Sequence, residues 1–484
     1  GFQSNLSGYE PGHRFRYDFA SFQQAIDLDS SLSTAVSGLG RALQQIGFWK
    51  DALEANRLAA ELDPESQLFQ SSYLYSATLS PLLTIDQVVQ EHAAWGQKIE
   101  ANTPICELSP DTSTDRTLRI CYVSPDIRHH ATMRFLMPLL EAHDRSNFEI
   151  YCYSETARED AVTEDVKKIA DGWCATRSLT DDELAQRIQN DRIDILVDLA
   201  GHTGDNRLPV FGRKPAPVQV SFLGYPTTTG LARVDYFLTD AVREPVSPER
   251  FFTETPVMLP HGAACYAPPN SPEITPPPCV ENGYITLGST HRVEKISPNT
   301  LQVWELVMAL LPNARLLIFR DVLQSESLRR MLSQQFSDAG IDISRVTFQW
   351  ELPDPYLQVY ANFDIMLDVF PWGSGTIAYD AMFMGVPIPT IAGDRGGCRT
   401  TASLMHNCGF PELATNSVDG YLGVVRQLAR DQSRLTDLRT SIRSAMQNTV
   451  CNGPRFANDI ENAYRRMWRK FTGDENETQR KELP

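Results

Sequence analysis

Short apolar segments alternate with amphipathic segments from residue 118 onward, and this alternation constrains the fold more than any other feature of the sequence. Four segments of the first run are rich in β-branched and aromatic residues: LRICYVS (118–124), FEIYCYS (148–154), IDILVDLAG (193–201) and VQVSFLGYP (218–226). Amphipathic stretches such as residues 181–192 lie between them. Continuous apolar strands that are separated by helices predict a parallel sheet with helices on both faces.

The alternation is interrupted once and then resumes. The interruption is APPNSPEITPPP at residues 267–278, which cannot form a regular element because proline lacks a backbone donor and fixes φ. Further apolar segments follow at residues 284–289, 314–320, 346–350, 365–371 and 387–393. One intervening helix should begin at Ser297-Pro298, a favoured pair for the N-cap and the first helical position. The sequence therefore predicts an α/β protein with two facing Rossmann-like lobes and a ligand cleft between them.

A helical segment precedes the strands. Residues 35–64 place small residues and a terminal proline at the offsets of a tetratricopeptide (TPR) repeat: Gly40, Ala52, Ala59 and Pro64. One repeat length earlier, about 34 residues, Ala25 falls at the Ala59 position, as in the second helix of a truncated repeat. Because solenoid repeats need neighbours, we expect this segment to dock on the body of the protein or to continue upstream. A generic helical hairpin is the alternative.

The chain has 484 residues, more than a single hydrophobic core normally holds, so several parts are expected. The predicted parts are a TPR-like helical segment (1–101), a polar linker (102–117), an N-terminal Rossmann-like lobe (118–266), a Pro-rich interlobe linker (267–280), a C-terminal Rossmann-like lobe (281–450), and a C-terminal helix with a polar tail (451–484). The chain begins with Gly1 rather than Met, which leads us to expect a fragment of a longer protein.

Charge and cysteine usage narrow the function classes. The net charge of −17 argues against binding of a nucleic-acid backbone as the main task, although it allows a local basic pocket. The nine cysteines occur singly and without a C-x-x-C pair, which favours reduced thiols in a cytoplasmic protein. No apolar run approaches the roughly 18–20 residues that span a bilayer, so no membrane partner is expected.

The first candidate site follows a strand of the second run, in IMLDVFPWGSGTIAYDAMFMGVP at residues 365–387. A Gly/Ser-rich turn leads into a helix near Gly375 and Thr376, where free N–H groups and the helix dipole would hold an anion such as a diphosphate. Asp380 lies about one turn further on the same face, where its carboxylate would accept a ribose hydroxyl. The alternative is a turn that needs glycine for its geometry alone, with Asp380 solvated.

A single lysine supplies a candidate cation for the same edge. Lys295 lies in STHRVEKISP (289–298), just before the predicted helix that starts at Ser297. A lysine in the cleft would neutralise a diphosphate leaving group, whereas a surface lysine would merely be solvated.

Loops that follow strands of the first run supply further polar residues. The stretch VSPDIRHHATMRFLMPLL contains His129 and His130, which are candidates for a base or a donor contact because imidazole titrates near neutral pH. Alternatively, one histidine is exposed and the other caps a helix. The stretches GHTGDNRL and KPAPVQVSFLGYPTTTG place five more candidates at strand ends: His202, Thr203, Arg207, Gly224 and Tyr225. The sequence has no HExxH, GxSxG, Walker or kinase motif and no paired-cysteine metal spacing, so neither a metal nor a cofactor is expected.

In their order along the chain, these segments resemble the glycosyltransferase family that contains protein O-GlcNAc transferases and SPINDLY-type protein O-fucosyltransferases. The resemblance covers about residues 35–470 and rests on RICYVSPDIRHHA, IDILVDLAGHTGDNRL, KPAPVQVSFLGYPTTTG, VDYFLTD, EKISPNTLQVW, LDVFPWGSGTIAYDAMFMGVP and VCNGPRFANDIENAYRRMW. It implies a GT-B fold behind a TPR segment. It also implies metal-independent, inverting transfer of a sugar from a nucleotide sugar to a Ser or Thr hydroxyl of a polypeptide.

The resemblance also implies residue roles. By position, Lys295 matches the lysine on the donor diphosphate, and His130 matches a histidine proposed as the base. Thr376 and Asp380 match a phosphate contact and the ribose carboxylate, and His202 matches a GHT turn near the donor. The C-terminal stretch VCNGPRFANDIENAYRRMW is closer to the SPINDLY-like branch, whose donor is GDP-fucose.

Several positions depart from the pattern of the family. Tyr356 replaces a histidine that packs on the nucleotide base, and it would still stack there. Gly375, Thr376 and Ile377 replace a threonine-rich run, so one hydroxyl is lost. The residues before the lysine are Thr290, His291 and Arg292, of which the arginine would still meet a phosphate.

The predicted function is protein O-glycosyl transfer from UDP-GlcNAc. One alternative is transfer of fucose from GDP-fucose. Another is a TPR binding protein with a degraded glycosyltransferase site, since the donor-site positions above are altered. A nucleotide-sugar epimerase is a third alternative, against which the repeat segment counts.

Overall fold

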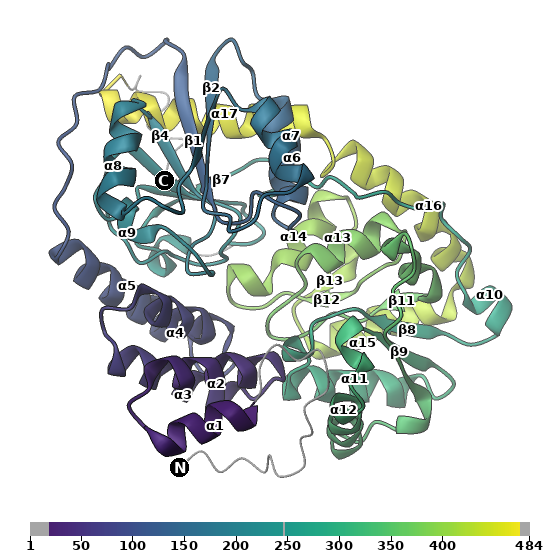
Figure 1. The fold of residues 1–484 in the computed structure, drawn as a ribbon. Coiled ribbons are helices and arrows are strands. Elements are labelled where there is room, and N and C mark those ends of the chain that lie inside the picture. Colours follow the sequence, from purple (N-terminus) through teal and green to yellow (C-terminus); the bar gives the residue numbers. More distant parts are fainter. Residues whose placement is uncertain (1–18, 245–246, 475–484) are drawn as a thin grey trace. The chain divides into compact units, whose positions relative to one another are not determined.

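The computed structural model describes residues 19–244 and 247–474 (Figure 1). The chain forms two compact units, which we call the first and second lobes. The first lobe comprises residues 70–78, 83–267 and 449–474, and the second lobe comprises residues 19–69, 79–82 and 268–448. The chain passes from the first lobe to the second between residues 267 and 268, at the start of the Pro-rich segment. Residues 475–484 of the predicted polar tail and residues 1–18 of the predicted helical segment lie outside the described residues.

The first lobe is built on a seven-stranded parallel sheet with the order β3-β2-β1-β4-β5-β6-β7. Its strands are β1 (Leu118–Ser124), β2 (Phe148–Ser154), β3 (Gly172–Ala175), β4 (Ile195–Asp198), β5 (Val218–Ser221), β6 (Tyr236–Thr239) and β7 (Thr255–Met258). The first two coincide with the predicted segments, while β3, β6 and β7 were not predicted as strands. The order of the first six is that of a Rossmann fold, as expected.

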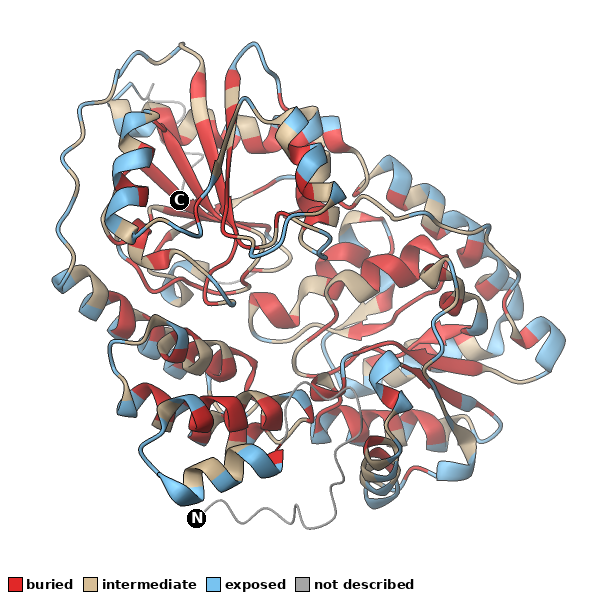
Figure 2. Cartoon of the chain, viewed as in Figure 1, coloured by how far each residue is buried: buried red, intermediate tan, exposed pale blue. Residues whose placement is uncertain are grey.

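Helices cover both faces of this sheet (Figures 1 and 2). Ile120 and Tyr122 of β1 pack in a core with α6 (Met133–Ala142), α7 (Ala161–Ile169) and α17 (Gly453–Thr472). The intervening Cys121 and Val123 pack in a second core with α8 (Asp181–Asn190) and α9 (Leu208–Phe211). Because successive side chains of a strand point to opposite faces, burial on both faces explains why the strand is apolar without alternation.

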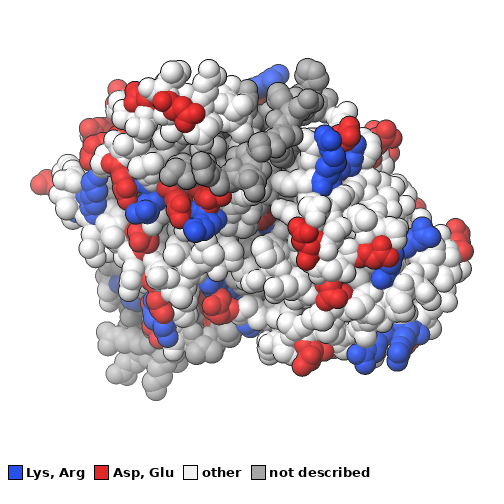
Figure 3. All heavy atoms as spheres, turned by 90° about the horizontal axis from the view of Figure 1, so that it is seen from below, with Lys and Arg blue, Asp and Glu red and all other residues white. Residues whose placement is uncertain are grey.

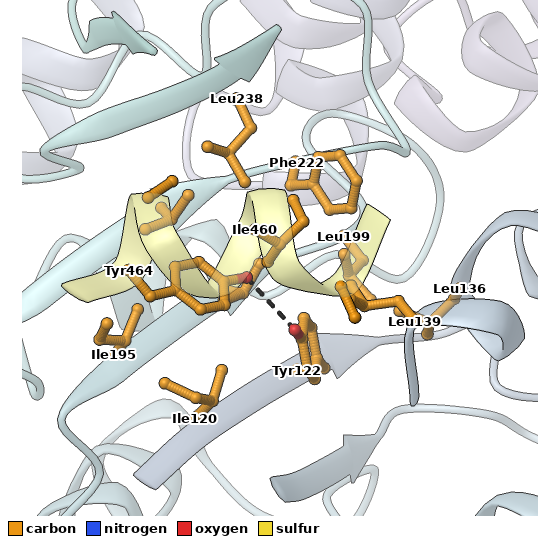
Figure 4. Packing of buried hydrophobic residues seen from close by; sticks show 14 of the residues in the cluster. Ile120, Tyr122, Leu136, Leu139, Ile195, Leu199, Phe222, Leu238, Ile460 and Tyr464 are labelled. Atoms are coloured by element: carbon orange, nitrogen blue, oxygen red, sulfur yellow. Dashed lines mark hydrogen bonds between the residues drawn. The ribbon is translucent and has the colours of Figure 1, made fainter. Parts of the chain in front are cut away.

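The C-terminal helix α17 belongs to the first lobe, although it follows the second lobe in sequence. Figure 4 shows Tyr464 of α17 directed towards Tyr122 of β1, and their hydroxyl oxygens lie 3.3 Å apart. The indole N–H of Trp468, a fully buried residue, donates to the Ser113 carbonyl oxygen at 3.2 Å. The sequence predicted the helix but not the lobe on which it packs.

The predicted helical segment 1–101 is divided between the lobes. Residues 70–78 of α4 (Gln67–Leu79), together with α5 (Ile85–Ala101), pack on the first lobe. A Cβ atom at Gly96 of α5 would lie 1.8 Å from the Gly230 carbonyl oxygen, so the two backbones touch. The final helix of the segment is therefore part of the first lobe rather than part of a separate solenoid.

The remaining helices of that segment, α1 (Phe19–Leu28), α2 (Ser33–Gln45) and α3 (Trp49–Leu62), belong to the second lobe. A Cβ atom at Gly40 would lie 2.6 Å from the Asn56 side chain, so the small residue allows α2 and α3 to cross closely, as predicted. The turn after α2 reaches the lobe itself, since Gly47 lies close to the backbone of Val293 and Glu294. Assignment of these helices to the TPR class stays a prediction.

The second lobe repeats the topology of the first with a smaller sheet. Its strands are β8 (Thr286–Ser289), β9 (Arg315–Phe319), β10 (Val346–Gln349), β11 (Ile365–Met366), β12 (Thr390–Ile391) and β13 (Ala414–Thr415), all paired in parallel. The order is β10-β9-β8-β11, and β12 pairs with β13. The Met366 N–H donates to the Pro387 carbonyl oxygen, which links β11 to the segment before β12. The result is a second Rossmann-like order, as expected.

Helices surround this sheet: α10 (Cys279–Asn282), α11 (Pro298–Leu310), α12 (Glu326–Asp338), α13 (Thr376–Phe383), α14 (Thr400–Asn407), α15 (Val418–Arg430) and α16 (Gln432–Asn448). The predicted start of α11 is confirmed, because the Ser297 side chain accepts a hydrogen bond from the Thr300 N–H at the N-cap. Within the described ranges, no helix is long and apolar enough to cross a bilayer. On the face in Figure 3, acidic and basic side chains are interspersed.

Candidate functional site

The turn before α13 has the features of an anion site. The N-cap of α13 is Gly375, which has no side chain to satisfy the first N–H groups of the helix. The neighbouring residues Thr376 and Ile377 are half-buried, whereas the helix behind them is buried. Uncapped N–H groups at a helix start bind anions readily, because the groups point outward and the helix dipole adds a partial positive charge.

Lys295 lies beside this turn. It is the last residue of the short 3-10 turn η2 (Val293–Lys295), and its Nζ donates to the Gly373 carbonyl oxygen at 2.9 Å. Burial lowers the pKa of Lys295 to about 8, and the positive charge of Arg292 acts in the same direction. The carboxylates of Asp368 and Glu294 oppose this shift. The Lys295 amino group thus lies beside the turn, and its binding of a diphosphate stays a prediction.

Asp380 and Tyr356 meet each other in the same lobe. Tyr356 begins the 3-10 turn η5 (Tyr356–Asn362), and its hydroxyl donates to Asp380 Oδ2 at 2.5 Å. Asp380 lies in α13 and is only 4% exposed, so the alternative of a solvated carboxylate is wrong. A carboxylate has acceptor capacity for about four hydrogen bonds, so a ligand hydroxyl could bind beside the tyrosine.

Two arginines add positive charge to the same edge of the second sheet. Arg292, whose side chain is 59% exposed, forms an ion pair with Glu294 at 3.1 Å. Arg320 directly follows β9, and its guanidinium lies 3.4 Å from the Thr290 carbonyl oxygen. Arg320 was not predicted as a site residue. Its position after a strand of a parallel sheet is the signal that would have identified it, since ligands bind at such strand ends.

His130 is exposed in the loop that follows β1 of the first lobe. Its Nδ1 accepts a hydrogen bond from the Thr132 N–H at 3.3 Å and lies 3.4 Å from Asp126 Oδ2. These contacts hold the ring through Nδ1. Its neighbour His129 is also exposed, and the His129 N–H donates to Asp160 Oδ2 at 2.7 Å.

His202 is buried within the first lobe, in contrast to its predicted contact with a donor. Its Nε2–H donates to the Thr229 carbonyl oxygen at 2.8 Å, so its Nδ1 accepts from the Ser71 hydroxyl at 3.1 Å. Burial and the neighbouring His92 lower the pKa of His202 well below its usual value. Because both ring nitrogens are bonded inside the protein, the geometry gives His202 a structural role.

Gly224 and the residues near it are also engaged internally. A Cβ atom at Gly224 would lie 1.8 Å from the Leu199 carbonyl oxygen, so the close backbone approach is to the protein itself and not to a ligand. The Tyr225 hydroxyl bonds to His92 Nε2 at 2.7 Å and to Thr78 Oγ1 at 2.8 Å. The Arg207 guanidinium is likewise bonded to carboxylates of the first lobe.

The second lobe therefore brings together six of the predicted residues: Arg292, Lys295, Tyr356, Gly375, Thr376 and Asp380. They follow β8, β10 and β11, at the carboxyl edge of its sheet. His130 follows β1, the corresponding strand of the first lobe. Their specific roles towards a ligand stay predictions.

The sequence matches a known protein family and several of its members. The sequence model described as glycosyl transferase family 41 matches residues 85–264 and 282–460. The SPINDLY protein of Oryza sativa subsp. japonica, described as a probable UDP-N-acetylglucosamine–peptide N-acetylglucosaminyltransferase, is 32% identical over 428 residues, which are 87% of this chain and 46% of that protein. The SPINDLY protein of Arabidopsis thaliana, with the same description, is 33% identical over 424 residues, with 85% and 46% coverage. The chain thus spans less than half the length of these relatives.

A solved structure matches most of the chain. It is that of a mutant O-GlcNAc transferase of Thermobaculum terrenum, which is 31% identical to this chain. The TM-score is 0.89, and the match covers 94% of this chain and 88% of the other. The fold seen here is therefore the fold of that protein.

Proposed function

The chain belongs to glycosyl transferase family 41, and from this premise we propose that it transfers a sugar from a nucleotide-sugar donor to a Ser or Thr hydroxyl of a polypeptide. We propose UDP-GlcNAc as the donor, in line with the printed descriptions of the relatives. The observation that carries the proposal is the placement of the Lys295 ammonium 2.9 Å from the Gly373 carbonyl oxygen, beside the uncapped start of α13.

In the proposed reaction, the acceptor oxygen attacks the anomeric carbon of the sugar while the bond from that carbon to the diphosphate oxygen breaks. Negative charge develops on the departing nucleoside diphosphate. The Lys295 ammonium, the N–H groups at the start of α13 and the Thr376 hydroxyl would stabilise this charge, and such fixed donors usually make the largest contribution to catalysis. The configuration at the anomeric carbon inverts, because attack and departure occur on opposite faces.

Two further residues have proposed roles in this reaction. Asp380 would accept a ribose hydroxyl beside its bond from Tyr356, and the tyrosine ring would lie against the base. The exposed His130 would orient the acceptor or take the proton that the acceptor hydroxyl loses.

The proposal also covers where the protein acts. We place it in the cytoplasm, since its cysteines occur as free thiols, among them the buried Cys121 and Cys152. The partners in this proposal are a nucleotide sugar and a polypeptide, with neither nucleic acid nor a metal required.

The test begins with ligand binding. Thermal stability is measured with UDP, UDP-GlcNAc, GDP and GDP-fucose, without added metal. A ligand at one hundred times its Kd stabilises a protein by about 2.7 kcal/mol, which raises the melting temperature measurably. Stabilisation by the uridine ligands supports the proposal, stabilisation by the guanosine ligands alone supports a fucosyl donor, and no stabilisation by any ligand supports a binding protein with a degraded site.

Transfer is then measured with labelled donor and Ser/Thr peptides. Lys295→Met should abolish transfer at an unchanged melting temperature, because it removes the ammonium but keeps the length of the side chain. Lys168→Met, at an exposed lysine of α7, is the matched control and should be fully active. Full activity of Lys295→Met would contradict the proposed role of this residue.

A further inference from the structure

A network of hydrogen bonds lies in the second lobe next to the turn at residues 373–376, which we call the anion turn. None of the residues in this network is needed for the roles proposed above. Its members are Ser289, His291, Ser374 and Asp368, and all four are fully buried. His291 Nδ1 lies 2.9 Å from the Ser289 hydroxyl, and His291 Nε2 lies 2.5 Å from the Ser374 hydroxyl. The Ser374 hydroxyl in turn lies 2.6 Å from Asp368 Oδ1.

The donors and acceptors of this hydrogen-bond network can be assigned consistently with a neutral His291. The Asp368 carboxylate can only accept, so the Ser374 hydroxyl must donate to it. The Ser374 oxygen then accepts from Nε2–H of His291, and Nδ1 of the neutral ring accepts from the Ser289 hydroxyl. Burial and the charges of Lys295 and Arg320 lower the pKa of His291 well below its usual value, which favours the neutral ring.

Asp368 anchors the hydrogen-bond network, because several groups donate to its carboxylate. Its Oδ1 also accepts from the backbone N–H groups of Val369 and Ser374, at 2.9 and 3.0 Å. Its Oδ2 accepts from the Thr390 hydroxyl at 2.6 Å. The carboxylate thus accepts four hydrogen bonds and is fully buried, so it acts on the turn and does not contact the substrate.

The hydrogen-bond network connects two loops, and both loops face the nucleotide sugar in the proposed function. His291 lies in the loop that follows β8 and leads to Lys295, and Ser374 lies in the turn that leads to α13. The same two loops are joined a second time by the bond from Lys295 Nζ to the Gly373 carbonyl oxygen, next to Ser374. A third link joins the Ser297 hydroxyl to the Phe370 carbonyl oxygen at 2.5 Å.

We propose that Asp368, Ser374 and His291 are positioning residues. They hold the loop at residues 290–295 against the anion turn, so that Lys295 and the first N–H groups of α13 meet the same diphosphate. The inference rests on the proposed function. It assigns a role to buried residues that do not touch the substrate. Displacement of a catalytic group by about 1 Å can lower a rate about 100-fold, which sets the size of effect that such residues can have.

The network has a second consequence for Lys295. Four groups act on its ammonium electrostatically: Arg292 lowers the pKa, and Asp368, Glu294 and Cys398 raise it. Replacement of Asp368 by asparagine removes a buried negative charge, so the Lys295 pKa should fall. The alkaline limb of the rate profile should then move to lower pH, which a purely structural role of Asp368 would not cause.

The experiment compares His291→Gln with His291→Phe. The glutamine amide can place an N–H group near the position of Nε2 and keep the bond to Ser374, whereas the phenylalanine keeps a ring and loses the bond. We expect His291→Phe to lower kcat/KM for the nucleotide sugar by up to about 100-fold, and His291→Gln to restore most of it. Ser374→Ala should resemble His291→Phe, and Ser76→Ala, at an equally buried serine of the first lobe, is the control.

The outcomes separate the inference from the proposed function. Wild-type kcat/KM in both His291→Phe and Ser374→Ala would overturn the inference and leave the proposed function intact. If the unaltered protein shows no transfer, the same variants are compared for binding of UDP, GDP and pyrophosphate by calorimetry. Weaker binding by the variants then supports the network, and equal binding overturns it. If His291→Phe does not fold, Ser374→Ala and the pH profile of Asp368→Asn decide, and an unmoved alkaline limb counts against the inference.

Discussion

The hydroxyl of Tyr356 donates to Asp380 Oδ2 at 2.5 Å, and this bond joins two residues from different elements that were both predicted to contact the nucleotide sugar. Tyr356 opens the turn η5, and Asp380 lies in α13. The tyrosine therefore fixes the orientation of the carboxylate that is proposed to bind the ribose. It holds a binding group in place before any ligand arrives, which reduces the ordering that the ligand must bring about.

This relationship predicts how Tyr356 variants differ. Tyr356→Phe keeps the ring and removes the bond to Asp380, and a hydrogen bond to a charged group contributes about 1.5–3 kcal/mol. We expect the KM for the donor to rise about 10-fold with little change in kcat, since the bond is present before and after the chemical step. Tyr356→Ala also removes the ring and should raise KM further. A lower KM in Tyr356→Phe would mean that the tyrosine competes with the donor instead of assisting it.

Activity should fall as the pH rises through about 8, the value to which burial lowers the pKa of Lys295. Below this pKa the ammonium is charged and stabilises the diphosphate, and above it the charge is lost. The pH dependence of kcat/KM reports the free enzyme, so this is the quantity to measure. In Lys295→Arg the guanidinium stays charged, and the alkaline limb should disappear even if the rate is lower. A limb that persists in this variant belongs to another group.

The first lobe should lose stability in mild acid because of His92. Burial lowers the pKa of His92 to about 4, while its Nδ1–H donates to the Val88 carbonyl oxygen at 2.6 Å. The unfolded state takes up the proton near pH 6.5, so the contribution is complete above that value and declines as the pH falls towards 4. Between pH 7 and 5 the loss should be about 2 kcal/mol.

The measurement for His92 is the change in melting temperature between pH 7 and 5, in the unaltered protein and in His92→Gln. Glutamine does not titrate, so the melting temperature of His92→Gln should decrease less between pH 7 and 5. Asp198, whose pKa burial raises to about 6, acts in the opposite direction but is present in both proteins and cancels in the comparison. Equal decreases would show that His92 is not the responsible group.

Replacement of two helical glycines by alanine should change the stability of the protein in opposite directions. At Gly96 the new Cβ would lie 1.8 Å from the Gly230 carbonyl oxygen, so α5 must move away from the first lobe and stability should fall. At Gly423 of α15 the new Cβ would have no atom within 4 Å apart from its chain neighbours and the backbone of its own helix, so Gly423→Ala should stabilise that helix by roughly 0.5–1 kcal/mol. Thermal unfolding of both variants checks the pair. A neutral Gly96→Ala would mean that α5 is not seated on the loop around Gly230.

The C-terminal helix should be required for stability of the first lobe. Trp468 of α17 is fully buried, and its replacement by alanine should cost roughly 3–5 kcal/mol. Phe471 lies on the same helix but is 42% exposed, so Phe471→Ala should cost much less. Denaturant unfolding of the two variants, followed by a signal from the first lobe, makes the comparison. Similar losses in both would argue that α17 contributes only its helix and not its buried face.

Much of the fold could be predicted because its signals are local. The apolar segments 118–124 and 148–154 become β1 and β2 without change, and Ser297 caps α11 as its sequence position indicates. The strand β3 escaped prediction because it is a short edge strand whose residues are partly exposed, so it lacks a continuous apolar pattern. Its identity as a strand comes from pairing with β2.

The candidate site was predicted less completely, and for a related reason. The leading interpretation of the polar residues at strand ends was contact with a ligand, and Lys295 does lie beside the turn that leads to α13. His202 and Tyr225 also follow strands, but α4 and α5 supply the residues that bond to them and bury them. The sequence of the first-lobe strands contains no pattern that predicts the packing of these helices on the carboxyl edge of the sheet.

The sequence by itself determined the element types, the two Rossmann-like halves and the family, because these depend on the period of apolar residues and on motifs within one segment. Tertiary structure alone decided that α17 completes the first lobe, that α5 seats on the Gly230 loop, and that His291 reaches Ser374 across 83 positions of the chain. Such contacts depend on which surfaces fit together when distant segments are packed. Side-chain packing and the pairing of buried polar groups are properties of two surfaces at once, and neither segment contains them alone.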